Sequence, residues 1–246
     1  MLSKAQNKYI RSLSQQKIRN EYKVFIAEGA KIALEWLSAP GPIAQIITTE
    51  EWYIAHEQVI KAHTEATLHI IKETELTGLS SLKTPNQVML VIPMPEKQQV
   101  PALNEWCLAL DDLQDPGNMG TIIRIADWFG IKHVICSPGC VDVYNAKVVQ
   151  SAMGGHLRVN FYEAELPVFL KATNLPKIAA TLDGENVYQT KRMDAGVLII
   201  GNESKGISNE VVAAATKKVM IPRKGGAESL NAGVSAGILC ALLLPC

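Results

Sequence analysis

The sequence predicts an α/β protein with two domains, the C-terminal one built on a parallel sheet flanked by helices. Short apolar runs alternate with amphipathic helical segments along most of the chain. Residues 107–136 have the order strand, helix, strand, which implies a parallel pair joined by a right-handed crossover. A segment with three prolines at 93–104 separates two apolar regions and has the composition of a linker.

The N-terminal domain, residues 1–95, is expected to be a small α/β layer. Apolar residues at helical spacing predict helices, and short β-branched runs beside turn residues predict strands. The expected elements are a helix at 25–38, a strand at 42–49, a helix at 50–63, a strand at 67–71, a helix at 73–82 and a strand at 87–92.

Residues 1–24 are strongly basic, although the whole chain has 24 Lys plus Arg against 24 Asp plus Glu. The cations are Lys4, Lys8, Arg11, Lys17, Arg19 and Lys23, and the single acid is Glu21. A solvated helix face explains most charge runs, and from this segment alone it is the favoured interpretation. The alternative is a surface that follows RNA phosphates, with Tyr9 and Tyr22 available to stack on unpaired bases.

The linker is placed at 96–105 and the C-terminal domain at 106–246. Three segments in this domain share the form strand, loop, helix, and parallel strands bring such loops to one edge of a sheet. The first has a strand at 107–110, a loop at 111–118 and a helix at 121–129. The second has an apolar strand, a loop bounded by Gly201 and Gly206, and a helix capped by Ser208 that ends at Lys217 and Lys218. The third runs from Val219 to Leu239.

The remaining elements of this domain are a strand at 132–136, a helix at 144–155 and a strand at 177–182. Five cysteines, an odd number mostly inside apolar runs, and the lack of a signal-like N-terminus indicate a reduced, cytoplasmic setting. Cys136 and Cys140 lack a second ligand pair, so packing is favoured over a metal site. The longest apolar run, 238–245, is too short to span a membrane.

Familiar catalytic fingerprints do not fit the loops of the C-terminal domain. Gly117 and Gly120 lack GxGxxG spacing, and the following strand ends without an acidic residue, which disfavours a nicotinamide enzyme. Residues 201–205 do not match a phosphate-binding loop, and Ser229 lacks the glycines of a nucleophile elbow. An α/β enzyme that uses another nucleotide is therefore the weakest functional hypothesis.

The third segment gives the positive signal. Gly233 and Gly237 inside a helix each cost about 1 kcal/mol relative to Ala, so close packing must exclude larger side chains there. Packing explains the helix, but it explains less well why the preceding loop concentrates polar residues. These are Arg223, Lys224, Glu228, Ser229 and Asn231.

These residues carry a family resemblance. IPRKGGAESLNAGVSAGI at 221–238 resembles the third motif of the SpoU (TrmH-like) RNA 2′-O-ribose methyltransferases of the SPOUT class. GNESKGIS at 201–208 resembles their second motif and DPGNMGTIIRIADWFG at 115–130 their first, in the same order and spacing across 106–246. The segment 17–37 is more loosely similar to the start of the family's RNA substrate-binding domain.

The resemblance implies a SPOUT-type domain with a deep trefoil knot, S-adenosylmethionine as cofactor, a homodimer with sites near the subunit interface, and no metal. It implies catalytic roles for Asn118, Arg124, Glu203, Ser229 and Asn231, with Arg124 at the catalytic arginine. Cofactor contacts are implied for Thr181, Leu182, Gly201, Asn202, Glu203, Gly206, Ile221, Ser229 and Leu230. RNA contacts are implied for Lys17, Arg19, Lys23 and Arg124.

The predicted function is methyl transfer to a ribose 2′-hydroxyl in structured RNA, ribosomal RNA being favoured over transfer RNA. Arg124 is a poor base because its guanidinium stays charged, so we expect electrostatic help or phosphate anchoring from it. Taken alone, Arg124 could instead pair with Asp127 or the 111–112 loop, Glu203 could be a loop acid near Lys205, and Asn118 a turn residue. The functional alternative is a non-catalytic RNA-binding protein that keeps the fold.

Overall fold

The computed structural model describes residues 2–80 and 86–245. These residues form two compact units. Unit 1 comprises 1–96 together with 144–157, and unit 2 comprises 97–143 together with 158–246. The predicted boundaries assign 144–157 to the C-terminal domain, whereas the contacts of this segment group it with unit 1.

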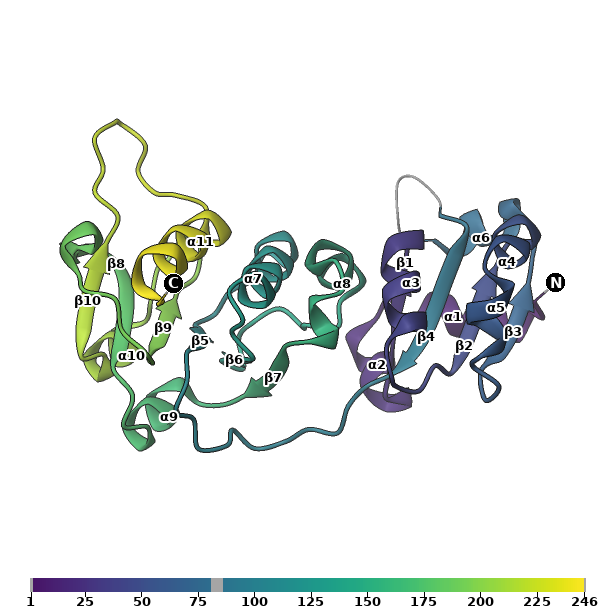
Figure 1. Ribbon diagram of the computed structural model, residues 1–246, viewed down its shortest axis with the longest axis horizontal. Coiled ribbons are helices and arrows are strands. Elements are labelled where there is room, and N and C mark those ends of the chain that lie inside the picture. The colour runs from purple at the N-terminus through teal and green to yellow at the C-terminus, as the bar shows by residue number, and fades with distance from the viewer. Residues whose placement is uncertain (1, 81–85, 246) are drawn as a thin grey trace. The chain divides into compact units, whose positions relative to one another are not determined.

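Unit 1 is a four-stranded sheet in the order β1, β4, β2, β3 (Figure 1). The strands are β1 Val24–Glu28, β2 Gln45–Thr48, β3 Thr67–Ile70 and β4 Val88–Pro93. β4 is antiparallel to β1 and β2, while β3 is parallel to β2. Its helices are α1 Lys4–Ser12, α2 Gln16–Tyr22, α3 Ala30–Ser38, α4 Glu50–Ala55, α5 Glu57–Lys61, α6 Glu73–Leu79 and α8 Ala146–Ala152.

The sheet of unit 1 is covered on both faces because successive strand residues alternate between them. Leu90 and Ile92 join one core with residues of α3, α4 and α5 and with Val149 of α8. Met89 and Val91 point to a second core that includes residues of α1 and α6. The α/β layer predicted for this region is confirmed.

Unit 2 is a six-stranded parallel sheet in the order β10, β8, β9, β5, β6, β7. The strands are β5 Cys107–Leu110, β6 His133–Cys136, β7 Asn160–Glu163, β8 Lys177–Asn186, β9 Val197–Ile200 and β10 Lys217–Met220. The central strands β5 and β9 are buried throughout, as their unbroken apolar sequences require. This sheet confirms the predicted fold class.

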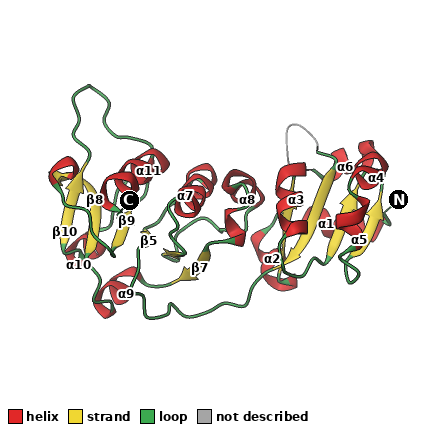
Figure 2. Cartoon of the chain, in the orientation of Figure 1, coloured by secondary structure: helices red, strands yellow, loops and turns green. Residues whose placement is uncertain are grey.

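Helices lie on both faces of this sheet (Figures 1 and 2). α7 Pro116–Trp128 packs against α11 Ala232–Leu243, and α9 Leu166–Ala172 packs against α10 Asn209–Ala214. Single turns of 3-10 helix lie at Gly155–Leu157 and Val187–Gln189. No helix in the described ranges is long and apolar enough to cross a membrane.

Several predicted element boundaries are wrong. Residues 24–28 form β1 rather than the start of a helix, and the helix predicted at 50–63 breaks at His56 into α4 and α5. α7 begins at Pro116, five residues before the predicted start at Thr121. α10 ends at Ala214, so Lys217 and Lys218 belong to β10. Positions 81 and 82 of the helix predicted at 73–82, and Cys246, lie outside the described residues.

Candidate functional site

The first two motif loops leave the same edge of the unit 2 sheet. β5 and β9 are parallel neighbours with Leu110 opposite Ile200, so the chain emerges from both at one level. The Asp111 N–H donates to the Ile200 carbonyl at 2.9 Å, and the Asn202 side-chain amide donates to the Asp112 carbonyl at 2.7 Å. These bonds hold the two loops together.

The second loop is a compact turn that depends on its glycines. Asn202 and Gly206 exchange two backbone hydrogen bonds of 3.0 Å. A Cβ on Gly201 would lie 2.3 Å from the backbone carbon of Gly206, and Gly206 itself has φ +70°. Because neither position accepts an ordinary side chain, the loop presents backbone groups at the sheet edge.

A chain of side-chain hydrogen bonds joins all three motifs. The Asn118 Nδ2 group donates to Glu203 Oε1 at 2.8 Å. The Asn231 Nδ2 group donates to Asn118 Oδ1 at 2.6 Å. We call these two linked hydrogen bonds, which run from Asn231 through Asn118 to Glu203, the amide relay. It brings together three of the five predicted catalytic residues, which lie far apart in sequence.

The direction of the amide relay is fixed by its ends. Glu203 accepts the hydrogen bond from Asn118, and it also accepts one from the backbone N–H of Asp115 at 3.2 Å. Asn231 is the N-cap of α11, and its Oδ1 accepts the N–H groups of Gly233 and Val234 at 2.9 and 3.2 Å. Each amide therefore has only one orientation that satisfies its neighbours. Asn118 is 8% exposed, whereas Glu203 and Asn231 at the two ends of the relay are exposed.

The local sequence explains how Asn118 reaches the relay. Asp115 is the N-cap of α7, with its Oδ1 accepting the Asn118 N–H at 2.8 Å, and Pro116 occupies the first turn. Proline is favoured there because its missing N–H would be unpaired anyway. Asn118 is thus a residue of the first helical turn, and its predicted place in a loop is wrong.

Arg124 lies on the exposed face of α7. The described residues offer it no hydrogen bond or ion pair. Its possible partner Asp127 is engaged elsewhere, because Arg158 donates to both Asp127 oxygens at 2.7 and 2.8 Å. A structural ion pair of Arg124 with Asp127 is therefore not observed.

Glu203 does not pair with the nearby Lys205. The Lys205 ammonium lies 3.8 Å from an Asp112 oxygen, while Glu203 takes part in the amide relay. Glu203 is thus a loop acid near Lys205 in sequence, and its hydrogen bonds join it to Asn118 and Asp115.

Asp111 is a further residue that builds the site, and the sequence patterns did not single it out. Its Oδ2 accepts the Ser208 N–H at 2.7 Å, which ties the end of β5 to the start of α10. The available signal was an acid placed directly after a buried strand.

Some residues predicted to contact the cofactor lie in the Gly201–Gly206 loop and offer backbone groups, and others offer apolar side chains. Leu182 on β8 is 77% exposed and Leu230 before α11 is 50% exposed, while Thr181 and Ile221 are half-buried. Ser229 is exposed in the long loop between β10 and α11 (Figure 1), and among the described residues it has no hydrogen-bond partner. In the same loop, the Arg223 guanidinium donates to the Ala227 carbonyl at 3.2 Å.

The three predicted RNA contacts of unit 1 separate into two kinds. Lys17 and Lys23 are exposed, as is Tyr22, which precedes Lys23. Arg19 is only 2% exposed, and its Nη1 donates to the carbonyls of Leu13 and Ser14 at 2.9 and 2.8 Å. Arg19 therefore links α2 to the turn that precedes it, with its side chain in the protein interior. The predicted contact of Arg19 with RNA does not fit this burial.

The cysteines behave as packing residues. Burial raises the pKa of Cys107 and of Cys240 to about 12. A hydrogen bond from Cys136 lowers the pKa of Cys140, whose Sγ lies 3.2 Å from the Leu110 carbonyl. Across 2–80 and 86–245, no group of three or more His, Cys, Asp or Glu side chains could hold a metal ion.

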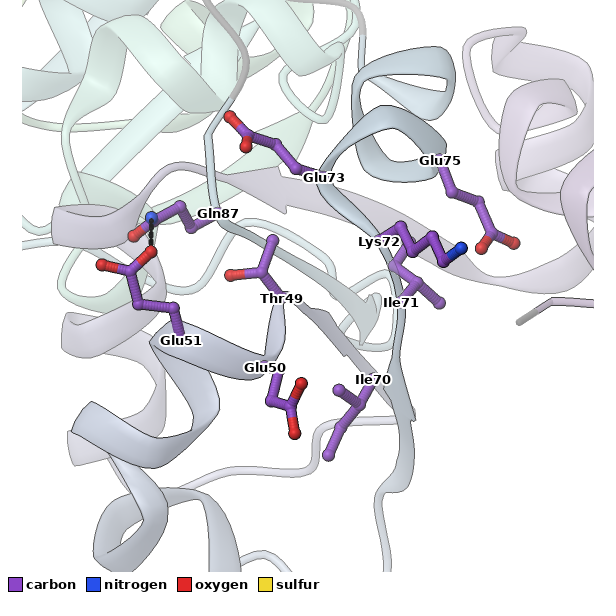
Figure 3. A pocket seen from close by; sticks show the side chains of 9 residues that line it. All are labelled: Thr49, Glu50, Glu51, Ile70, Ile71, Lys72, Glu73, Glu75 and Gln87. Atoms are coloured by element: carbon purple, nitrogen blue, oxygen red, sulfur yellow. Dashed lines mark hydrogen bonds between the residues drawn. The ribbon is translucent and has the colours of Figure 1, made fainter.

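Unit 1 also contains a cavity of about 480 Å³, remote in sequence from the three motifs (Figure 3). Among the described residues, its wall includes the carboxylates of Glu50, Glu51, Glu73 and Glu75 and one cation, Lys72. Such a lining repels phosphate, so the cavity is not suited to RNA.

Comparison with known proteins agrees with this geometry. The SpoU rRNA Methylase family matches residues 105–241, and the MRM3-like substrate binding domain matches residues 4–90. The Bacillus subtilis protein named 23S rRNA (guanosine(2553)-2′-O)-methyltransferase RlmP is 30% identical over 233 residues, covering 93% of this chain and 92% of that protein.

Two solved structures share the fold over nearly the whole chain. A TrmH-family protein from Porphyromonas gingivalis superposes with a TM-score of 0.86 at 33% identity, covering 99% of this chain and 98% of that one. An AdoMet-bound rRNA methyltransferase from Sinorhizobium meliloti gives 0.86 at 27% identity, covering 98% and 94%. With the three motifs joined at one sheet edge and the family matching more than half of its length, this chain belongs to the SpoU rRNA methylase family.

Proposed function

We propose that this protein transfers a methyl group from S-adenosylmethionine to a ribose 2′-hydroxyl in structured RNA, ribosomal RNA being favoured over transfer RNA. The amide relay carries this proposal, because it assembles the three motifs into one site with Arg124 on the same helix as Asn118. The B. subtilis relative is named for 23S rRNA, which makes that RNA the first substrate to test.

The residues of the sheet edge suit S-adenosylmethionine. Gly201, Asn202, Glu203 and Gly206 form the tight loop, and Ile221, Leu230 and Leu182 supply apolar surface, two of them exposed. Thr181 and Ser229 complete the proposed contacts. Apolar walls with convergent backbone groups are typical of small-molecule sites. When bound, the cofactor supplies a methyl group already activated on a sulfonium.

The chain then has to orient the ribose and favour loss of the hydroxyl proton. Arg124 is free of partners among the described residues, exposed and permanently charged, so it can hold a phosphate or stabilise negative charge developing on the 2′-oxygen. The amide relay contributes by holding the motif loops in place through the hydrogen bonds of Asn118, Glu203 and Asn231. Lys17 and Lys23 of unit 1 contact RNA backbone in this proposal.

Replacing Arg124 tests the proposal. We expect Arg124→Ala to lower the rate of methyl transfer to 23S rRNA by about 10²- to 10³-fold, the usual effect of removing one preorganised charge donor. Arg124→Lys keeps the positive charge but loses the planar guanidinium group, so we expect it to retain intermediate activity. Calorimetry should give the same affinity for S-adenosylmethionine in all three proteins. Full activity in Arg124→Ala would contradict the catalytic role.

The second candidate is an RNA-binding protein that keeps the fold without the chemistry. The intact amide relay and the exposed Leu230 next to Asn231 favour the enzyme. Calorimetry on the wild-type protein separates the two candidates. Binding of S-adenosylmethionine supports the enzyme, and no binding at millimolar cofactor supports the second candidate.

We further propose a homodimer, a trefoil knot in unit 2 and a cytoplasmic location. The outward face of α11 supports the dimer, because Val234, Ile238 and Ala241 are exposed or half-buried on a helix that is apolar all round. The family resemblance supports the knot. The free thiols of Cys107, Cys136, Cys140 and Cys240 suit a reducing compartment.

A further inference from the structure

An exposed stripe runs along α7 from the amide relay toward the end of the helix. Thr121, Arg124 and Trp128 are exposed, while Ile122, Ile123 and Ala126 between them are buried against the unit 2 core. Positions 121, 124 and 128 are three and four residues apart, so they share one face of the helix. Trp128 is 83% exposed, which is unusual for the largest apolar side chain.

Charged side chains lie one turn before Trp128 and directly before it on α7. Arg124 lies one turn before it, and Asp127 is neutralised by Arg158 through two hydrogen bonds of 2.7 and 2.8 Å. Arg158 is also exposed. A flat aromatic ring beside cations is the combination that proteins use for single-stranded nucleic acid, with bases stacked on the ring and phosphates held by the charges.

The spacing of the stripe fits a strand of RNA. Four residues of helix separate Arg124 from Trp128, about 6 Å along the axis. This is comparable with one nucleotide step of an unstacked strand. A strand whose target ribose or adjoining phosphate is held by Arg124 therefore brings a neighbouring base to Trp128.

We infer that Trp128 is a substrate-positioning residue that stacks on an unpaired base next to the methylated nucleotide. The inference rests on the proposed function, because Arg124 sets the place of the target ribose. It specifies the substrate further: the nucleotide beside the target must be unpaired when it binds.

Fluorescence tests the stacking without requiring activity. Trp52 and Trp106 are buried and Trp36 is half-buried, so added RNA should quench mainly Trp128. We expect decauridylate and decaadenylate to quench the emission of the whole protein, and a blunt RNA duplex of about two helical turns not to. The quenching should vanish in Trp128→Phe, which lacks the fluorophore. Absence of quenching, equal quenching by the duplex, or quenching that survives in Trp128→Phe would overturn the inference.

Steady-state kinetics with a 23S rRNA transcript test the positioning role. Trp128→Ala and Trp128→Leu should raise KM for RNA about tenfold or more while kcat and the affinity for S-adenosylmethionine stay unchanged. Trp128→Phe still stacks and should stay within a few-fold of wild type. Val168→Ala, a change at a 67% exposed residue of α9, is the matched control and should leave KM unaltered.

The outcomes separate three explanations. An unchanged KM in Trp128→Ala overturns the inference and leaves the proposed function standing. A raised KM accompanied by a halved mass in light scattering shows that Trp128 contacts a second copy of the chain, and also overturns it. If the wild-type protein transfers no methyl group to RNA, the proposed function fails. The fluorescence measurement still decides whether Trp128 stacks on single-stranded RNA.

Discussion

Asn118 is the residue on which the candidate site depends most directly. Its amide donates to Glu203 and accepts from Asn231 at once. Removing it breaks both hydrogen bonds of the amide relay, each worth about 0.5 to 1.5 kcal/mol. The residue therefore links the Gly201–Gly206 loop to the start of two helices, α7 and α11.

Exchanging the amide and the carboxylate between positions 118 and 203 tests the amide relay. Asn118→Asp places a second carboxylate against Glu203 and should weaken the binding of S-adenosylmethionine. Glu203→Gln alone removes the charge-assisted acceptor and should also weaken it. When both changes are combined, the new amide at position 203 can donate to the new carboxylate at position 118, so we expect most of the affinity to return in calorimetry. Strictly additive losses in the double variant would show that the two side chains do not interact.

Two arginines show what residue type alone can and cannot tell. Arg19 lies in a basic run and Arg124 in an apolar helix, yet Arg19 is the buried one and Arg124 is exposed. Arg19 is buried because two main-chain carbonyls of the preceding turn accept its donors. Nothing in the spacing of residues 1–24 indicates which cation turns inward.

Among the elements, the close approach of α7 and α11 explains one of the two helical glycines. A Cβ on Gly233 would lie 2.8 Å from Thr121 Cγ2 and 3.2 Å from the Asn231 oxygen of the amide relay. A Cβ on Gly237 would meet Ile125 at 3.5 Å, which is an ordinary contact. Close packing therefore excludes even a methyl group at Gly233, whereas at Gly237 a methyl group fits.

This difference predicts opposite effects for the same substitution. Gly237→Ala should raise the free energy of unfolding by about 0.5 to 1 kcal/mol, because alanine favours the helix and fits the space. Gly233→Ala should lower it by about 1 to 3 kcal/mol through overpacking against Thr121. Urea unfolding of the two variants measures both values. Equal shifts in the two would contradict the packing seen between α7 and α11.

For the molecule as a whole, the segment 144–157 shows how a chain can cross its own domain boundary. Phe25 of β1 contacts Tyr144 and His156 with ring centroids 4.8 and 6.4 Å apart, and Val149 is buried in the same core. A Cβ on Gly154 would collide with the Glu35 carboxylate. Unit 1 therefore includes a helix that lies between β6 and β7 in sequence, and the linker at 96–105 is not its only connection to unit 2.

The proposed homodimer gives a prediction for the whole molecule. Light scattering should give twice the 26.8 kDa mass of one chain. Ala241 is exposed in the last turn of α11, where a lysine suits the helix dipole but disrupts an apolar interface. We expect Ala241→Lys to reduce the mass toward that of one chain, and Val168→Lys on α9 to leave it unchanged. A single-chain mass in the wild-type protein would refute the dimer.

The parallel sheet of unit 2, the α/β layer of unit 1 and the family could all be predicted from the order of residues along the chain. These features depend on local patterns: buried strands are apolar runs, and each of the three motifs is continuous in sequence. Three other features required the folded chain. Asn231, Asn118 and Glu203 form one hydrogen-bonded chain, Asp127 binds Arg158 and leaves Arg124 free of partners among the described residues, and residues 144–157 complete unit 1. Each of these partners is distant in sequence, so no local pattern specifies the pairing.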